Sequence, residues 1–238
     1  MNLAMWSGPR NLSTAMMYSF AARPDCQVWD EPFYAAYLQA TGLDHPMRDE
    51  IMAAGERDPA SVISACLAPP EIGKSLFYQK HMSQHMIQGF SRAWINQCTN
   101  VFLIRHPARV IASYAAKREN PTLLDIGFVQ QAEMFRQLRD QTGQTPVVID
   151  SYDIRQAPEA SLRALCAAIG IPFYSEMLTW PSGGHAADGV WAQHWYGAVW
   201  KSTGFAAPEA DLPEIPDQLL SVLDGAMDSY AFLKEYAL

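Results

Sequence analysis

The chain has 238 residues, of which 49% are hydrophobic and 18% charged, so it can bury a sizeable core, and we expect one domain over residues 1–238. Its net charge of −8 argues against binding to nucleic acid or an anionic membrane, because no basic field would attract polyanions. Four widely spaced cysteines without a CxxC pair indicate neither a zinc site nor a disulfide framework, and the lack of a membrane-length apolar run or a basic leader favours a cytoplasmic protein.

Short apolar runs predict five buried strands, at Leu3–Trp6, Gln27–Trp29, Leu76–Gln79, Val101–Ile104 and Pro146–Ile149. Helical patterns separate most of these runs. Leu12, Met16 and Phe20 recur every four residues after the first strand, and Val110, Ile111 and Tyr114 form an apolar face after the fourth. The alternation predicts an α/β fold with a mainly parallel five-stranded sheet flanked by helices.

The pattern changes after the fifth strand. We expect a helix over Ala160–Ile169, a glycine- and tryptophan-rich stretch over residues 181–205, and a final helix from about Pro216 to Tyr236. Glycines give the middle stretch backbone freedom, and a long ordered loop within a domain is more often functional than decorative. Residues 181–205 are therefore interpreted as a lid.

The first motif, Ser7–Thr14, lies between a predicted strand and a predicted helix. A helix start offers free N–H groups and the positive end of a dipole to an anion, and Arg10 adds a fixed positive charge. Ser13 and Thr14 add hydroxyls, while Gly8 shapes the turn. The segment lacks the Gly-Lys-Ser/Thr ending of a Walker A motif, which disfavours ATP hydrolysis. An ordinary strand–turn–helix with a capping serine is the alternative.

The second motif follows the fourth strand, which ends at Arg105. Pro107 suits the first turn of the next helix, and Ser113 lies eight residues after the arginine. Helical side chains tilt toward the N-terminus, so Ser113 can lean back toward Arg105. The pair is expected to grip one phosphate group.

Together the two motifs resemble those of sulfotransferases that use 3′-phosphoadenosine 5′-phosphosulfate (PAPS). Ser7–Thr14 looks like their 5′-phosphosulfate loop and Ile104–Ser113 like their 3′-phosphate motif, in the right order and at successive strand–helix junctions. The resemblance implies a three-layer, P-loop-NTPase-like fold, PAPS as co-substrate, adenosine 3′,5′-bisphosphate (PAP) as product, and no metal. The nucleotide-binding residues that it implies are Ser7, Gly8, Arg10, Asn11, Leu12, Ser13, Thr14, Arg105 and Ser113.

Two positions stand out within this resemblance. Arg10 takes the place of the family's usual loop lysine and is expected to contact the sulfuryl oxygens during transfer. Leu12 departs where the family commonly has glycine, and its Cβ limits close approach of the backbone to a ligand.

Two places offer a base for the proton that the acceptor loses. Glu31 follows the second strand at the edge where open α/β proteins bind ligands, and some sulfotransferases carry a similar Glu-Pro there. The third strand runs into Lys80, His81 and His85, loosely similar to the family's Lys/His segment near the acceptor. A helix cap for Glu31 and structural roles for the histidines are the alternatives, and Asp30 is expected to be structural.

The lid segment offers aromatic rings and a cation together. Its tryptophans can stack on adenine, although core packing explains them equally well. By resemblance to the family's C-terminal Lys–Gly segment, Lys201 adds a second contact to the 3′-phosphate.

The sequence thus predicts a sulfotransferase that moves a sulfuryl group from PAPS to a hydroxyl or amine of a small-molecule acceptor. A P-loop-type nucleotide or metabolite kinase is one alternative, and a non-catalytic nucleotide-binding protein of the same fold is another. A pyridoxal-phosphate enzyme has only the lysines in its favour. The acceptor's identity and the oligomeric state are left open, although apolar content within Tyr34–Gly55 and Asp58–Pro70 favours a small or lipophilic acceptor.

Overall fold

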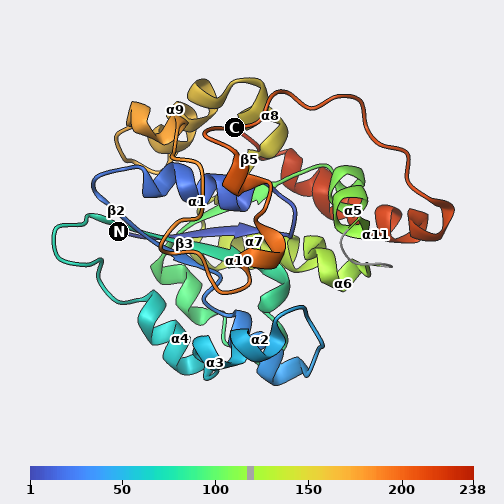
Figure 1. The fold of residues 1–238 in the computed structure, drawn as a ribbon, viewed down its shortest axis with the longest axis horizontal. Coiled ribbons are helices and arrows are strands. Elements are labelled where there is room, and N and C mark those ends of the chain that lie inside the picture. Colours follow the sequence, from blue (N-terminus) through green and yellow to red (C-terminus); the bar gives the residue numbers. More distant parts are fainter. Residues whose placement is uncertain (117–120) are drawn as a thin grey trace.

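A five-stranded sheet forms the centre of the computed structural model, which describes residues 1–116 and 121–238 (Figure 1). The strand order is β2-β3-β1-β4-β5, and neighbouring strands pair in parallel. The strands are β1 (Asn2–Ser7), β2 (Cys26–Asp30), β3 (Leu76–Met82), β4 (Thr99–Ile104) and β5 (Val147–Asp150). Each overlaps one of the predicted apolar runs, so the predicted sheet is confirmed.

Helices cover both faces of this sheet. They are α1 (Ser13–Ala21), α2 (Tyr34–Thr41), α3 (Arg48–Ala54), α4 (Pro59–Cys66), α5 (Pro107–Ala115), α6 (Leu123–Ile126), α7 (Phe128–Thr142), α8 (Ser151–Gln156), α9 (Pro158–Ala168), α10 (Ala192–Trp195) and α11 (Leu220–Lys234). Short 3-10 turns lie at Ser83–His85, Ala93–Gln97, Ser175–Leu178, Val199–Lys201 and Asp217–Leu219.

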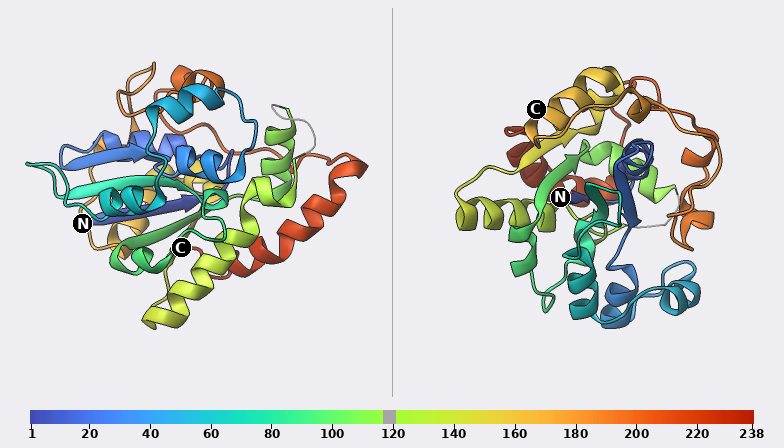
Figure 2. Two further views of the ribbon diagram at one scale, coloured as in Figure 1. Left: turned by 90° about the horizontal axis from the view of Figure 1, so that it is seen from below. Right: turned by 90° about the vertical axis from the view of Figure 1, so that its left-hand side faces the viewer.

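The alternation of side chains along β1 explains the three layers. Leu3 and Met5 pack against α1 and α9 on one face, whereas Ala4 and Trp6 pack against α4, α7 and α11 on the other. Figure 1 shows α1, α8 and α9 on one side of the sheet and α2, α3 and α4 on the other. In Figure 2, α7 and α11 run side by side. Both faces are thereby covered, as a parallel sheet requires.

Local sequence sets where several helices begin. Pro107 and Pro158 lie in the first turns of α5 and α9, where the missing N–H costs nothing. The predicted helix Ala160–Ile169 corresponds to α9, and the predicted Pro216–Tyr236 helix becomes a 3-10 turn followed by α11. None of the helices within residues 1–116 and 121–238 is both long and apolar enough to cross a membrane.

The strand order determines where a ligand can bind. β1 lies at the centre, with β2 and β3 on one side and β4 and β5 on the other, so the connections from its carboxyl end and from that of β3 leave in opposite directions. Open α/β sheets bind ligands in the crevice at such a switch point.

The glycine- and tryptophan-rich segment, residues 181–205, closes over this crevice. Its ends are joined by hydrogen bonds from Trp180 N to Thr203 O (3.1 Å) and from Gly183 N to Trp200 O (2.7 Å). Between them, Trp191 and Tyr196 are buried. The segment is therefore a packed wall of the crevice, and Tyr196 brings it to the cavity described next.

Candidate active site

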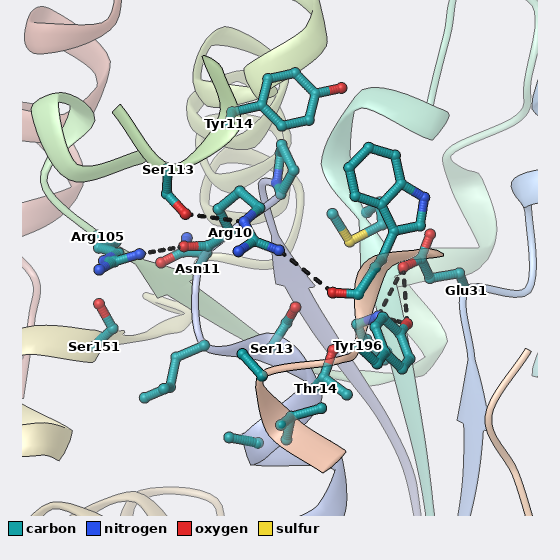
Figure 3. A pocket seen from close by; sticks show the side chains of 18 of the residues that line it. Arg10, Asn11, Ser13, Thr14, Glu31, Arg105, Ser113, Tyr114, Ser151 and Tyr196 are labelled. Carbon is teal, nitrogen blue, oxygen red and sulfur yellow. Dashed lines mark hydrogen bonds and ion pairs between the residues drawn. The ribbon is translucent and has the colours of Figure 1, made fainter. Parts of the chain in front are cut away.

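A cavity of about 370 Å³ opens at the carboxyl ends of the strands, a volume typical of small-molecule sites. One wall is formed by residues 9–15, which comprise the end of the β1–α1 loop and the first residues of α1. Others come from the ends of β3 and β4, from α2, α5 and α8, and from residues 195–206. Figure 3 shows side chains from these elements pointing toward one another.

The β1–α1 loop presents the start of α1 to the cavity. Leu12 occupies the N-cap position in the left-handed conformation (φ 65°), where its side chain can accept no hydrogen bond. Ser13 and Thr14 begin the helix and line the cavity, so its first N–H groups and its positive dipole end are directed there. A helix start of this kind is suited to bind an anion, and it is called the anion site below. The left-handed φ of Leu12 is also the conformation that glycine adopts most easily.

Other residues of the first motif support the loop from behind. The Asn11 amide donates to the carbonyl oxygen of Leu103 (2.7 Å) and ties the loop to β4. Ser7 is fully buried in β1. A Cβ at Gly8 would lie 2.3 Å from the Ile126 carbonyl oxygen. Neither Ser7 nor Gly8 lines the cavity, so their predicted contact with nucleotide is not supported by the geometry.

Two arginines face this anion site (Figure 3). Arg10, itself at a left-handed φ of 57°, donates from Nε to Ser113 Oγ (2.9 Å) and from Nη1 to Trp195 O (3.5 Å). Arg105 Nη1 donates to the carbonyl oxygen of Arg10 (2.6 Å). Burial, and then the positive charge of Arg105, lowers the pKa of Arg10. A bound anion would offset both effects. Thus the two predicted motifs do meet in one cavity.

A buried charged cluster forms the opposite end of the cavity. Lys80 Nζ donates to Asp30 Oδ1 (2.8 Å), Glu31 Oε1 (2.7 Å) and the Tyr196 hydroxyl (2.5 Å). Tyr196 donates in turn to Asp30 Oδ2 (2.8 Å). Glu31, Lys80 and Tyr196 line the cavity, whereas Asp30 lies behind them and also accepts from Gly189 N (3.1 Å).

Burial makes Glu31 more basic than an ordinary glutamate. Burial raises the pKa of Glu31, and the negative charge of Asp30 adds to that effect, although Lys80 opposes it. Burial would lower the pKa of Lys80, but the two carboxylates outweigh it and raise the pKa. One lysine thus pairs with two carboxylates, and Glu31 holds a proton more tightly than an ordinary glutamate. It also has a left-handed φ of 42°, a strain typical of functional sites.

The two predicted histidines lie in different environments. His81 faces away from the cavity, stacks on Trp6 at 4.5 Å, and has its pKa lowered to about 3 by burial. The prediction of His81 as the base is therefore corrected, because adjacent residues of a strand point to opposite faces and Lys80 takes the cavity side. His85 does line the cavity between Tyr34 and Tyr37, and burial lowers its pKa well below the usual value.

Some residues of the predicted lid line the cavity, and others do not. Trp195 and Tyr196 line the cavity, but Trp191 is buried and donates to the Tyr196 hydroxyl (3.0 Å), and Trp200 donates to Asp188 (2.9 Å). Lys201 is exposed and does not line the cavity, so its predicted phosphate contact is not brought about in this structure.

Sequence reasoning missed Arg155 and Tyr196, which both line the cavity. Arg155 lies on α8, directly after β5, and the rule that carboxyl ends of parallel strands meet would have found it. Tyr196 gives no such signal, because a tyrosine in an aromatic stretch is typical of a core. Among the residues that the structure describes, no group of three or more His, Cys, Asp or Glu is placed to hold a metal ion.

Two relatives of Arabidopsis thaliana match nearly the whole chain. Branched-chain-amino-acid aminotransferase-like proteins 1 and 2 are 36% identical over 231 residues and 35% identical over 230 residues, covering 97% and 96% of this chain. The chain spans 41% and 40% of their lengths, so it matches about two fifths of each protein.

Solved structures with the same fold are sulfotransferases. Mouse sulfotransferase SULT7A1 complexed with PAP matches with a TM-score of 0.58 and 12% identity over 99% of this chain and 89% of that chain. The sulfotransferase domain of the Synechococcus PCC 7002 olefin synthase matches with a TM-score of 0.51 and 17% identity over 94% and 93%. These matches confirm the predicted three-layer α/β fold.

A family model described as a sulfotransferase domain matches residues 1–237. That match includes both predicted motifs, both ends of the cavity and the segment that closes over it. The chain therefore belongs to the sulfotransferase domain family.

Proposed function

We propose that this protein transfers a sulfuryl group from PAPS to a hydroxyl or amine of a small acceptor. The observation that carries the proposal is that the two ends of the cavity differ: a helix start with two arginines lies at one end and a buried carboxylate–lysine cluster at the other. Sulfuryl transfer needs both, an anion site for the donor and a base for the acceptor.

The donor belongs at the arginine end. The N–H groups at the start of α1 and the Arg10 guanidinium are suited to the 5′-phosphosulfate, whereas Arg105 and Ser113 are suited to the 3′-phosphate. That a sulfotransferase with this fold is complexed with PAP supports the same choice of nucleotide.

The chemistry follows from the two ends. The acceptor oxygen or nitrogen attacks sulfur in line, the bond from sulfur to the bridging phosphate oxygen breaks, and PAP leaves with the electron pair of that bond. Arg10 and the loop amides stabilise the charge that develops on the leaving phosphate. Glu31 accepts the proton that the acceptor loses.

Glu31 is a better base than His85. A raised pKa increases proton affinity, so Glu31 is a stronger base than an ordinary carboxylate, whereas the lowered pKa of His85 weakens the imidazole. His85 Nδ1 has no hydrogen-bond partner within residues 1–116 and 121–238, which suits it to hold the acceptor rather than to take its proton. Lys80 orients the Glu31 carboxylate through the contact at 2.7 Å.

The acceptor we propose is a small molecule, because the cavity must hold the nucleotide and the acceptor together. The aromatic rings of Tyr34 and His85 at the carboxylate end favour an acceptor with an apolar body. A cytoplasmic location, where PAPS would be at hand, belongs to the same proposal.

The name of the Arabidopsis relatives suggests a different chemistry, aminotransfer. That name describes proteins of which the matched region is about two fifths, and the matched family model over this region describes a sulfotransferase domain. Aminotransfer is therefore not carried over to this chain.

A binding comparison tests the proposal. Calorimetry with PAP, adenosine monophosphate (AMP) and magnesium ATP should give tightest binding to PAP, and PAPS with a panel of alcohols and amines should give sulfated product. Tightest binding to magnesium ATP would favour a kinase instead. PAP binding without turnover on any acceptor would favour a non-catalytic nucleotide-binding protein.

A further inference from the structure

A buried carboxylate lies against the arginines at one end of the cavity. Glu209 lies in the stretch 206–216, which contains neither helix nor strand and joins the closing segment to α11. Its side chain is only 2% exposed. Glutamate is seldom buried to this extent unless it is paired, so its partners determine what this position is built to hold.

Three arginines surround that carboxylate. Arg105 Nη2 is paired with Glu209 Oε1, Arg155 Nη1 lies 2.6 Å from the same oxygen, and Arg109 Nε lies 3.0 Å from Oε2. The arginines come from the end of β4, from α5 and from α8. Three separate elements thus direct guanidinium groups to one point, and Arg105 and Arg155 also line the cavity.

The charges at this point do not balance. Among residues 1–116 and 121–238, three guanidinium groups carry three positive charges at this point, and the ion pairs there include one carboxylate with one negative charge. A phosphate monoester carries about −1.5 to −2 charges near neutral pH and has three acceptor oxygens. It would therefore satisfy the arginines better than the carboxylate does, and arginine is well suited to phosphate geometry.

We propose that Glu209 occupies the position of the nucleotide's 3′-phosphate, and that Arg109 and Arg155 complete this site with Arg105. The inference rests on the proposed use of PAPS. Glu209 must leave the arginines before the nucleotide can bind fully, so the stretch 206–216 acts as an internal competitor for the donor. Further contacts hold that stretch in place, because Arg155 Nε donates to Ala207 O (2.8 Å).

If Glu209 competes with the 3′-phosphate, removing its negative charge should tighten the binding of PAP. Glu209→Gln keeps the shape of the side chain but removes its charge, and PAP should bind about tenfold more tightly, because a charge-assisted contact no longer competes. Affinity for AMP, which lacks only the 3′-phosphate, should stay unchanged. The matched control is Glu159→Gln, which removes an exposed glutamate paired with Arg163 at 2.7 Å and should change neither affinity.

A second pair of variants tests the arginine itself. Arg155→Gln should weaken PAP binding about tenfold and leave AMP binding unchanged. When Arg155→Gln is combined with Glu209→Gln, the increase in PAP affinity that Glu209→Gln causes should be smaller than in the unaltered background, because both changes act on one site.

Limited proteolysis tests the displacement in the unaltered protein. Cleavage after Glu209 by a glutamate-specific protease should accelerate when PAP is added and not when AMP is added, because the buried side chain is released.

The inference fails if Glu209→Gln binds PAP as the unaltered protein does or more weakly, or if PAP does not accelerate the cleavage. If the unaltered protein and Glu209→Gln prefer PAP over AMP by the same factor, only this inference is lost. If neither protein prefers PAP over AMP, the proposed use of PAPS is lost and this inference with it.

Discussion

Replacing Glu31 with glutamine separates catalysis from donor binding. The amide can still accept a hydrogen bond from Lys80 Nζ, which lies 2.7 Å from Glu31 Oε1, but it cannot take up a proton. The side chain lies at the carboxylate end of the cavity, away from the arginines that face the donor site. Turnover should therefore fall while PAP affinity stays as it was.

The expected loss follows from the role assigned to Glu31. A positioned general base contributes about 10² to 10⁴ in rate, so kcat should fall by that factor, which corresponds to about 3 to 5 kcal/mol in the activation barrier. The pH profile should change as well. In the unaltered protein, log kcat should rise with pH up to the raised pKa of Glu31, and the glutamine variant should lose that inflection.

Although Glu31→Gln should lower turnover, it should not lower the stability of the folded protein. Because burial raises the pKa of Glu31 in the folded protein, the folded state binds the proton more tightly than the unfolded state. The stability that comes from this tighter proton binding at Glu31 is complete at low pH and is lost as pH rises through the pKa of the folded state. Glu31→Gln should thus unfold at no lower temperature than the unaltered protein near neutral pH, and any gain should shrink on acidification.

The assay is kcat with the best acceptor from the panel, measured beside the PAP dissociation constant and the unfolding midpoint. Glu50→Gln, at an exposed position on α3, is the matched control and should change neither kcat nor the PAP dissociation constant. Undiminished kcat in Glu31→Gln would refute the role of Glu31 as the base. Loss of PAP affinity equal to the loss of kcat would refute the separation of the two ends.

Three further outcomes are expected. Arg105→Ala should weaken PAP binding about tenfold to hundredfold and AMP binding far less, and equal losses in calorimetry would contradict a 3′-phosphate contact. Gly8→Ala should lower the free energy of unfolding by more than about 1 kcal/mol in chemical denaturation, since its Cβ would lie 2.3 Å from Ile126 O, whereas Gly197→Ala meets open space and should not. Because burial lowers the pKa of His81 to about 3 in the folded protein, the unfolded state binds a proton that the folded state does not, and the unaltered protein should lose about 2 kcal/mol of stability between about pH 8 and about pH 5. His81→Gln should abolish that loss, and an unchanged pH dependence would contradict the lowered pKa.

The sheet was predictable because its strands are apolar runs, but their ends were not. β3 continues to Met82, beyond the predicted end at Gln79, because Lys80 is buried within the strand. A prediction from hydrophobic runs ends the strand before a lysine, because lysine is charged. This one is tolerated because Asp30 at the end of β2 and Glu31 directly after it supply its counter-charges, although both are distant in sequence.

The candidate site was predictable where it rests on contiguous motifs. The two motifs assign Arg10 and Arg105 to one nucleotide, and both side chains line one cavity. The bond from Arg10 to Ser113 was not expected, because the serine had been paired with Arg105. Arg155 and Tyr196 depend on how α8 and the closing segment fold back on the sheet, which local patterns do not encode.

Two adjacent residues of the closing segment, Trp195 and Tyr196, touch opposite ends of the cavity. The carbonyl oxygen of Trp195 accepts from Arg10, and the hydroxyl of Tyr196 accepts from Lys80. A shift of this one turn of chain would disturb the contact with Arg10 in the β1–α1 loop and the contact with Lys80 in the buried charged cluster together. Any effect that a ligand at one end exerts through this turn on affinity at the other end must be matched by an equal effect in the reverse direction, since thermodynamic linkage is reciprocal. This turn is thus the direct structural link between the proposed donor site and the proposed acceptor site.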